Sequence, residues 1–191
     1  MNKINKIIYF FKIGCYNSIK SLRKKEITME STLQGKVKSI DFAIYLTKKA
    51  KDMNVYINLT KLQKLLYICY GLYLAFAEDY LLDERPEAWQ YGPLFPKVHK
   101  KQKENNNSLE RLITSIDEAD FKEFDFVVNI VLETFKDWTA IDLVNWTHEE
   151  GTAWHKRYIK QNKPRTFLDN FDIKLDFSKF IINEEGDYNE N

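Results

Sequence analysis

The chain has 191 residues and a mass of 22.8 kDa, a size that suits one domain with an appendage. With 44% hydrophobic residues and only six Gly and four Pro, the composition disfavours a β-sandwich and favours helices joined by short loops. Residues 1–28 carry seven basic side chains and one acidic one, which leaves the remainder with 22 basic and 27 acidic groups. Such a mildly acidic body disfavours tight binding of duplex nucleic acid, which needs a basic footprint.

Residues 1–35 are interpreted as a basic N-terminal extension that is either disordered or translated upstream of a true start at Met29. An apolar patch at residues 7–13 is interrupted by Lys12, and no small-residue cleavage site follows it, so the pattern is not that of a secretory signal. A basic amphipathic helix that contacts a partner or a membrane is the alternative interpretation. Whether residues 1–28 belong to the natural product stays open.

The two cysteines, Cys15 and Cys69, fit neither a disulfide framework nor a metal cage, so a reducing cytoplasm is the expected location. The longest uncharged run, residues 65–77, has 13 residues. That is too short to span a bilayer, and the sequence therefore predicts no membrane association for the body of the chain.

The apolar pattern predicts a compact, mainly α domain. Helical spacing over residues 39–53 predicts a first helix, and a break follows at residues 54–59. Thr60 and Gln63 have the spacing of a capping box, which begins a second helix at about residues 60–77. Because this helix is apolar on every side, it is predicted to be buried all round and to form the centre of the domain.

A small β-hairpin is predicted at about residues 80–91, with short strands at 80–82 and 88–90 around a turn. Pro96 suits the first turn of a helix that runs through Lys103.

The C-terminal half is predicted to continue with helices. A capping box at residues 115–118 leads into a helix that ends at Trp138, and the next helix begins at Thr139 and runs through His148. Trp154 begins a short helical piece. Beyond it, residues 172–177 alternate like a strand, whereas residues 178–182 can cap and begin a last helix. The domain is assigned to residues 36–182 and an acidic polar tail to residues 183–191.

Two pairs of residues stand out against this background. Lys61 and Lys64 lie near a helix N-terminus, where positive charge opposes the helix dipole, so helix stability does not explain them. The simplest interpretation is that their stems pack while their ammonium groups reach water. Trp89 and Tyr91 lie at a tight turn, where aromatic side chains either anchor a partner or close a core; core is favoured for Trp89.

No catalytic, cofactor-binding or metal-binding residue is predicted, and the chain is not expected to be an enzyme. His148 and His155 are seven residues apart, wider than a helical zinc pair requires, and His99 lies in a lysine-rich helix where it is expected to be solvated. Basic runs at residues 97–103 and 156–165 are interpreted as solvated faces. They also suit an acidic protein patch, and Tyr158 within the second run suits stacking on a nucleobase.

Several blocks of sequence, in order along the chain, resemble the Panacea domain of SocA-like and GepA-like phage-associated antitoxins. They are Lys61-Leu62-Gln63-Lys64-Leu65-Leu66-Tyr67, Gly71-Leu72-Tyr73-Leu74-Ala75, Glu87-Ala88-Trp89-x-Tyr91-Gly92-Pro93-x-x-Pro96-x-Val98, Thr139-Ala140-x-x-Leu143, and Thr147-His148-Glu149 with Trp154. The resemblance covers roughly residues 38–160.

The resemblance implies an antitoxin that neutralises a cognate toxin by direct protein binding. Similar domains accompany unrelated toxins, among them enzymes similar to alarmone synthetases. In the SocA case the antitoxin instead delivers its toxin to a protease, so a protease adaptor is one alternative, and a nucleic-acid-binding regulator that uses the basic runs is another. The family has no established catalytic residues. The motif positions are therefore family markers and candidate partner-binding residues: Lys61, Gln63, Lys64, Tyr67, Glu87, Trp89, Tyr91, Gly92, Pro93, Pro96, Thr147, His148 and Trp154.

Overall fold

A computed structural model describes residues 37–180, so the predicted extension at 1–35 and the predicted tail at 183–191 lie outside it. The α-helices are α3 (Ser39–Asp52), α4 (Leu59–Ala77), α5 (Pro96–Glu104), α6 (Asp125–Phe135), α7 (Ala140–Thr147) and α8 (Asn170–Ser178). Two 3-10 helices, η1 (Glu110–Ser115) and η2 (Glu118–Phe124), precede α6, and a π-helix, η3 (His155–Lys160), follows α7. Strands β1 (Glu87–Trp89) and β2 (Gly92–Leu94) form an antiparallel hairpin. The predicted mainly α architecture with one small hairpin is confirmed.

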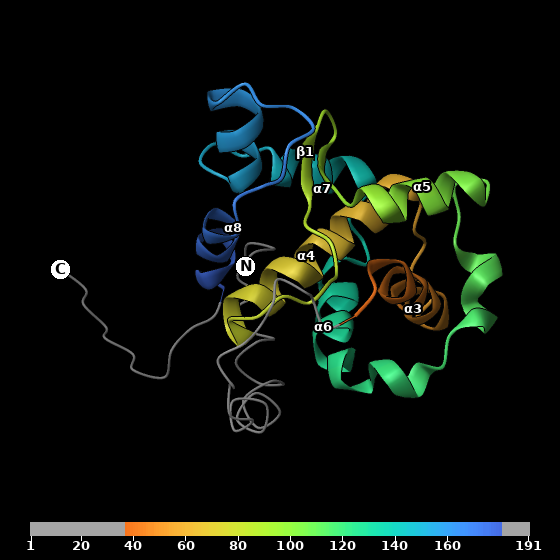
Figure 1. Cartoon of the computed structure of the whole chain (residues 1–191). Helices are drawn as coiled ribbons and strands as arrows, with labels where there is room; N and C mark the ends of the chain where they lie inside the picture. The colour runs from red at the N-terminus through yellow and green to blue at the C-terminus, as the bar shows by residue number, and fades with distance from the viewer. Residues whose placement is uncertain (1–36, 181–191) are drawn as a thin grey trace.

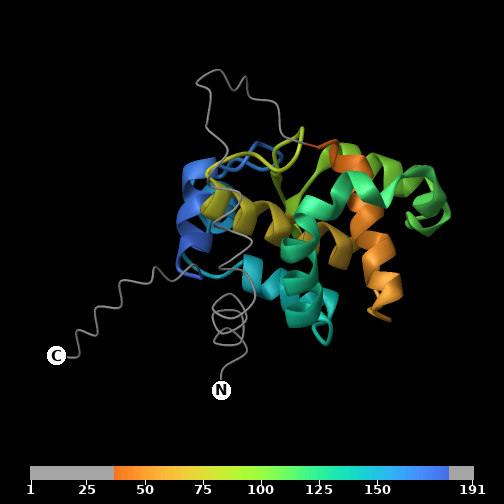
Figure 2. The same ribbon diagram turned by 90° about the horizontal axis from the view of Figure 1, so that it is seen from below.

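The α4 helix is the centre of the fold, as its pattern predicts. Every residue from Lys61 to Leu74 is buried, and α4 contacts α3, α5, α6, α7, α8 and β2. Figures 1 and 2 both show α3 and α8 on opposite sides of α4, with the hairpin and α5 along one of its flanks. A helix that is apolar all round loses contact with water only when other elements surround it, and this requirement arranges the rest of the chain.

The predicted capping box at Thr60 and Gln63 is wrong. The helix begins one residue earlier, and the Asn58 side chain caps it by accepting a hydrogen bond from the Lys61 amide at 2.8 Å. Thr60 thus lies inside the first turn. Gln63 does not reach back to the cap because its side-chain amide forms hydrogen bonds with other segments of the core.

The hairpin lies further along the chain than predicted. Glu87 pairs with Leu94 and Trp89 with Gly92, while Leu82 forms only an isolated bridge with Val37. Gln90 and Tyr91 make the turn, and Gly92 follows it with a φ of +94°, a conformation that favours glycine. The strand prediction at residues 80–82 used local pattern alone, whereas the pairing is set where Gly92 lets the chain reverse.

Two further local predictions are wrong. The capping box at residues 115–118 does not form: Ser115 donates to the Leu112 carbonyl, and Asp117 caps η2 by accepting from the Ala119 amide. Residues 172–177 are not a strand but part of α8, which begins after the Asp169 cap. Burial explains the second error, since α8 packs Ile173 and Phe177 inward, four residues apart, and an alternating pattern over six residues fits a helix with one buried stripe as well.

The packing of α8 on α4 depends on Gly71. A Cβ atom added there would lie 2.2 Å from two ring carbons of Phe177, so the helices approach closely only because residue 71 has no side chain. The same Phe177 ring makes an edge contact with Tyr67 at a centroid distance of 5.5 Å. The glycine therefore fixes how deeply α8 is seated.

We predict that Gly71→Ala lowers the free energy of unfolding by about 1–3 kcal/mol, because the overlap with Phe177 outweighs the higher helix propensity of alanine. Urea unfolding followed by circular dichroism measures the change. In a Phe177→Leu background, which makes room for the new methyl group, the cost of Gly71→Ala should shrink. Equal or higher stability of Gly71→Ala in the otherwise unchanged protein contradicts the explanation.

Candidate functional site

The separate sequence blocks meet at Gly92. A Cβ atom added to Gly92 would lie 2.8 Å from Cε of Lys64 in α4 and 2.8 Å from Oγ1 of Thr147 in α7. Thr147 is itself buried and donates its hydroxyl to the Val144 carbonyl at 2.9 Å. Since neither neighbour is free to move away without loss of packing, this point of contact between helix, hairpin and helix requires glycine.

Lys64 is buried in the interior, with 2% of its surface exposed. Its ammonium group donates a hydrogen bond of 2.8 Å to the carbonyl of Pro93 in β2. Burial lowers the pKa of Lys64 from its ordinary value of 10.5 to about 7. The prediction that the Lys61 and Lys64 ammonium groups reach water is therefore wrong, because each side chain extends inward to a backbone carbonyl; Lys61 donates to Lys136 O at 2.9 Å, and burial lowers its pKa.

Gln63 joins the same helix to the start of α5. Its side-chain oxygen accepts a hydrogen bond from the Phe95 amide at 2.8 Å, and its nitrogen donates to Oε1 of Gln102 at 2.7 Å. Gln102 is buried in turn and extends to the Leu59 carbonyl. Both polar ends of Gln63 are thus satisfied inside the core, which holds the hairpin and α5 at one position along α4.

His148 and Trp154 form a stack of parallel rings that continues with Tyr158. The ring centroids of His148 and Trp154 are 3.6 Å apart and those of Trp154 and Tyr158 are 4.7 Å apart, with interplanar angles of 8° and 12°. The Trp154 indole donates to the Trp89 carbonyl at 2.7 Å, so the stack is tied to the hairpin. Burial, with a contribution from the nearby Lys64 charge, lowers the pKa of His148 to about 4.

Trp89 and Tyr91, the two aromatic residues of the hairpin, have different surroundings. Trp89 is half-buried, donates its indole proton to Glu87, and lies 4.8 Å under the guanidinium of Arg165. Tyr91 is 66% exposed at the turn. The expectation that His99 is solvated is wrong: it is half-buried with its ring 5.7 Å from Trp89, and burial lowers its pKa.

The comparison with known families can now be set beside this geometry. Residues 62–155 match the family model described as antitoxin SocA-like, Panacea domain. By this match, residues 62–155 form a Panacea domain. Searches of curated proteins and of solved structures found no match. The match supports an antitoxin-type role of a regulatory rather than catalytic kind.

The Panacea stretch runs from the first turn of α4 to the start of η3, and its marker residues are mostly interior. Tyr67 packs against Phe177, Pro93 belongs to the buried strand β2, and Pro96 occupies the first turn of α5. Among the thirteen positions predicted from the motifs, Tyr91 alone is classed as exposed. The Panacea motifs therefore describe mainly how the domain is built.

Sequence reasoning overlooked the contribution of α8, which lies outside the Panacea match. Its Asp176 accepts a hydrogen bond of 2.6 Å from the Ala153 amide, and Phe177 and Phe180 pack against Trp146 of α7. The apolar positions 173, 177 and 180 have helical spacing and follow a capping residue at 169, a signal that identifies the helix.

Neither a metal centre nor a membrane span is found in the part of the chain that the structure describes. Within residues 37–180 no three His, Cys, Asp or Glu side chains gather as a ligand set for a metal ion. None of the helices found there is long and apolar enough to cross a bilayer.

The burial of Lys64 predicts a pH-dependent stability. Between about pH 7 and the ordinary lysine pKa of 10.5, the unfolded chain binds a proton that the folded Panacea domain does not, so the free energy of unfolding should rise with pH. Relative to Lys64→Met, the unchanged protein should gain up to about 1.4 kcal/mol per pH unit in this interval. Urea unfolding of both proteins over a pH series checks the slope. Parallel stability curves would mean that the amine stays charged in the core.

Proposed function

We propose that this protein is the antitoxin of a toxin–antitoxin pair and neutralises its cognate toxin by direct protein–protein binding. The observation that carries the proposal is the Panacea match over residues 62–155. The antitoxin acts by covering the active site of the toxin, or the route by which substrate reaches it, and performs no chemistry of its own. Its place of action is the cytoplasm, and enzymes similar to alarmone synthetases are candidate toxins.

The distribution of exposed apolar side chains supports a protein partner. Phe171 and Leu175 lie four residues apart in α8 and are 75% and 56% exposed, and Phe167 precedes them at 52%. Residues four apart share one face of a helix, so they form a continuous apolar strip on the outside of the domain. Exposed apolar strips with polar borders are typical of protein interaction sites.

The charge balance favours protein over nucleic acid as the partner. Of the second basic run, Lys156 pairs with Asp172 at 2.7 Å and Lys160 lies 3.5 Å from Glu150. Arg165 is stacked on Trp89. These cations are partly neutralised or engaged within the domain, which leaves a weak footprint for phosphate groups.

Co-expression with the product of the adjacent gene tests the proposal. That product alone should arrest growth, the pair should grow, and the two proteins should co-purify. A harmless neighbour, or a neighbour that stays toxic beside this chain, contradicts an antitoxin function. If the toxin disappears from cells and reappears when the host's proteases are deleted, the protein is instead a protease adaptor. Salt-sensitive binding to its own promoter identifies a nucleic-acid-binding regulator.

We predict that Phe171→Ser combined with Leu175→Ser weakens binding to the toxin about tenfold or more, since buried apolar anchors carry most of an interface's energy. Because both side chains are exposed, the free energy of unfolding should change by less than about 1 kcal/mol. Tyr56→Ser is the matched control: Tyr56 is 80% exposed but lies in the connection between α3 and α4, outside α8. Calorimetric titration of the purified proteins measures the affinities, and unchanged affinity of the double variant excludes this strip from the interface.

A further inference from the structure

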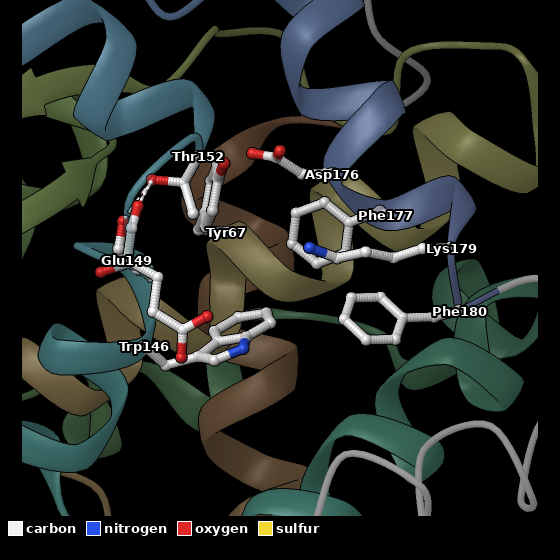
Figure 3. A pocket seen from close by; sticks show the side chains of 9 residues that line it. Tyr67, Trp146, Glu149, Thr152, Asp176, Phe177, Lys179 and Phe180 are labelled. Atoms are coloured by element: carbon white, nitrogen blue, oxygen red, sulfur yellow. Dashed lines mark hydrogen bonds between the residues drawn. The ribbon is translucent and has the colours of Figure 1, made fainter. Parts of the chain in front are cut away.

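A small hollow between α7 and α8 is walled by aromatic rings. Tyr67 of α4, Trp146 of α7, Phe177 of α8 and Phe180, which follows α8, line it, as Figure 3 shows. The Trp146 ring lies 5.9 Å from Phe177 and 6.1 Å from Phe180, measured between ring centroids. The cavity volume is about 20 Å³, which is room for one group the size of a water molecule.

Two carboxylates border the same hollow. Asp176 is half-buried and accepts a hydrogen bond from the Ala153 amide; burial raises the pKa of its carboxyl group. Glu149 is exposed and forms no ion pair with any residue between 37 and 180. Both carboxylates line the hollow beside aromatic faces, whose π-systems also attract cations. The hollow thus combines several features that favour a positive charge.

A cation of the chain itself lies at the rim. The Lys179 ammonium is 5.4 Å from the Phe180 ring centroid, and its charge acts to lower the pKa of Asp176. Figure 3 shows the Lys179 side chain extending along the wall that Phe177 and Phe180 form. Lys179 is an exposed residue that follows the last turn of α8, so its ammonium is readily displaced to water.

The apolar strip on α8 leads to this rim. Phe171, Leu175 and Lys179 follow one another at intervals of four residues, and the backbone of Lys179 is still helical, so the three side chains lie along one stripe. A partner that covers Phe171 and Leu175 can therefore extend along the same helix face to the rim of the hollow. The strip supplies apolar contact area. The hollow beside it supplies two carboxylates and admits only a small group.

We propose that the hollow receives the side chain of a lysine of the partner toxin, whose ammonium is attracted by the carboxylates of Asp176 and Glu149 and whose methylene stem packs against the aromatic wall. This inference rests on the proposed antitoxin function. An ammonium is close to a water molecule in size and suits the hollow, whereas the wider guanidinium of arginine does not. On binding, the incoming ammonium takes the place of the Lys179 charge, so the chain's own lysine competes with the partner's.

The first test uses a small probe and needs no toxin. N-acetyl-L-lysine methylamide is titrated into the full chain while the NMR signal of the Trp146 indole N–H is followed. The lysine probe should shift this signal, and the norleucine and arginine analogues should shift it less or not at all. Absence of a shift with the lysine probe, or equal shifts with all three, overturns the proposal.

Three variants sharpen the test. Glu149→Gln combined with Asp176→Asn keeps the shape of the hollow and the acceptor for the Ala153 amide, and should weaken lysine binding about tenfold. Lys179→Met removes the competing charge at similar length and should tighten binding. Glu150→Gln is the matched control, because it removes one exposed carboxylate next to the hollow but not in it. Thermal unfolding of each variant verifies that the fold is retained.

The second test repeats these variants in the toxin complex. The combined Glu149→Gln and Asp176→Asn variant should lower toxin affinity about tenfold and Lys179→Met should raise it, while Glu150→Gln leaves it unchanged. If the unchanged protein binds and neutralises the toxin but the carboxylate variant does so equally well, the lysine site is refuted and the antitoxin function stands. If the unchanged protein neutralises nothing, the antitoxin function fails, and the probe titration decides whether the hollow binds a lysine ammonium.

Discussion

The hydrogen bond from the buried Lys64 ammonium to the Pro93 carbonyl, with its neighbour from the Phe95 amide to Gln63, is the constraint on which the rest of the domain depends. A polar group in the interior is tolerated only where it forms a hydrogen bond, and the Lys64 ammonium is too deeply buried to bond to water instead. These bonds therefore allow the hairpin a single position along α4. Gly92 sits at that position because the two helices leave no room for a side chain.

The C-terminal part of the domain is attached to the same hairpin. The Trp154 indole binds the Trp89 carbonyl, and residues 165–168 run along β1 with backbone hydrogen bonds to Ala88 and Pro86. The hairpin is thus held from α4 on one side and from the C-terminal segment on the other, as the view in Figure 1 makes clear. Seating of α8 against Gly71 completes the enclosure of α4 and turns Phe171 and Leu175 toward solvent.

The Panacea marker residues and the exposed apolar side chains of α8 lie in different parts of the domain. The Panacea marker residues are used inside the domain, where packing and hydrogen bonding restrict them. Surface side chains on α8, outside the matched stretch, are free of those restrictions. Recognition of the Panacea stretch thus identifies how the interior of the domain is built and does not by itself identify a partner.

The sequence by itself determined several of the helices, because hydrophobic periodicity is local: the central helix at residues 60–77, the Pro96 helix and the Thr139 helix all follow from it. It also determined the family, since the blocks occur in order. Only the tertiary structure decided that the Lys61 and Lys64 ammonium groups lie inside, that the strands pair at residues 87–94, and that Asp176 and Trp146 share a hollow. Each of these depends on groups 29 or more residues apart or on a hairpin register, and local periodicity carries no information about which distant carbonyl or ring a side chain will meet.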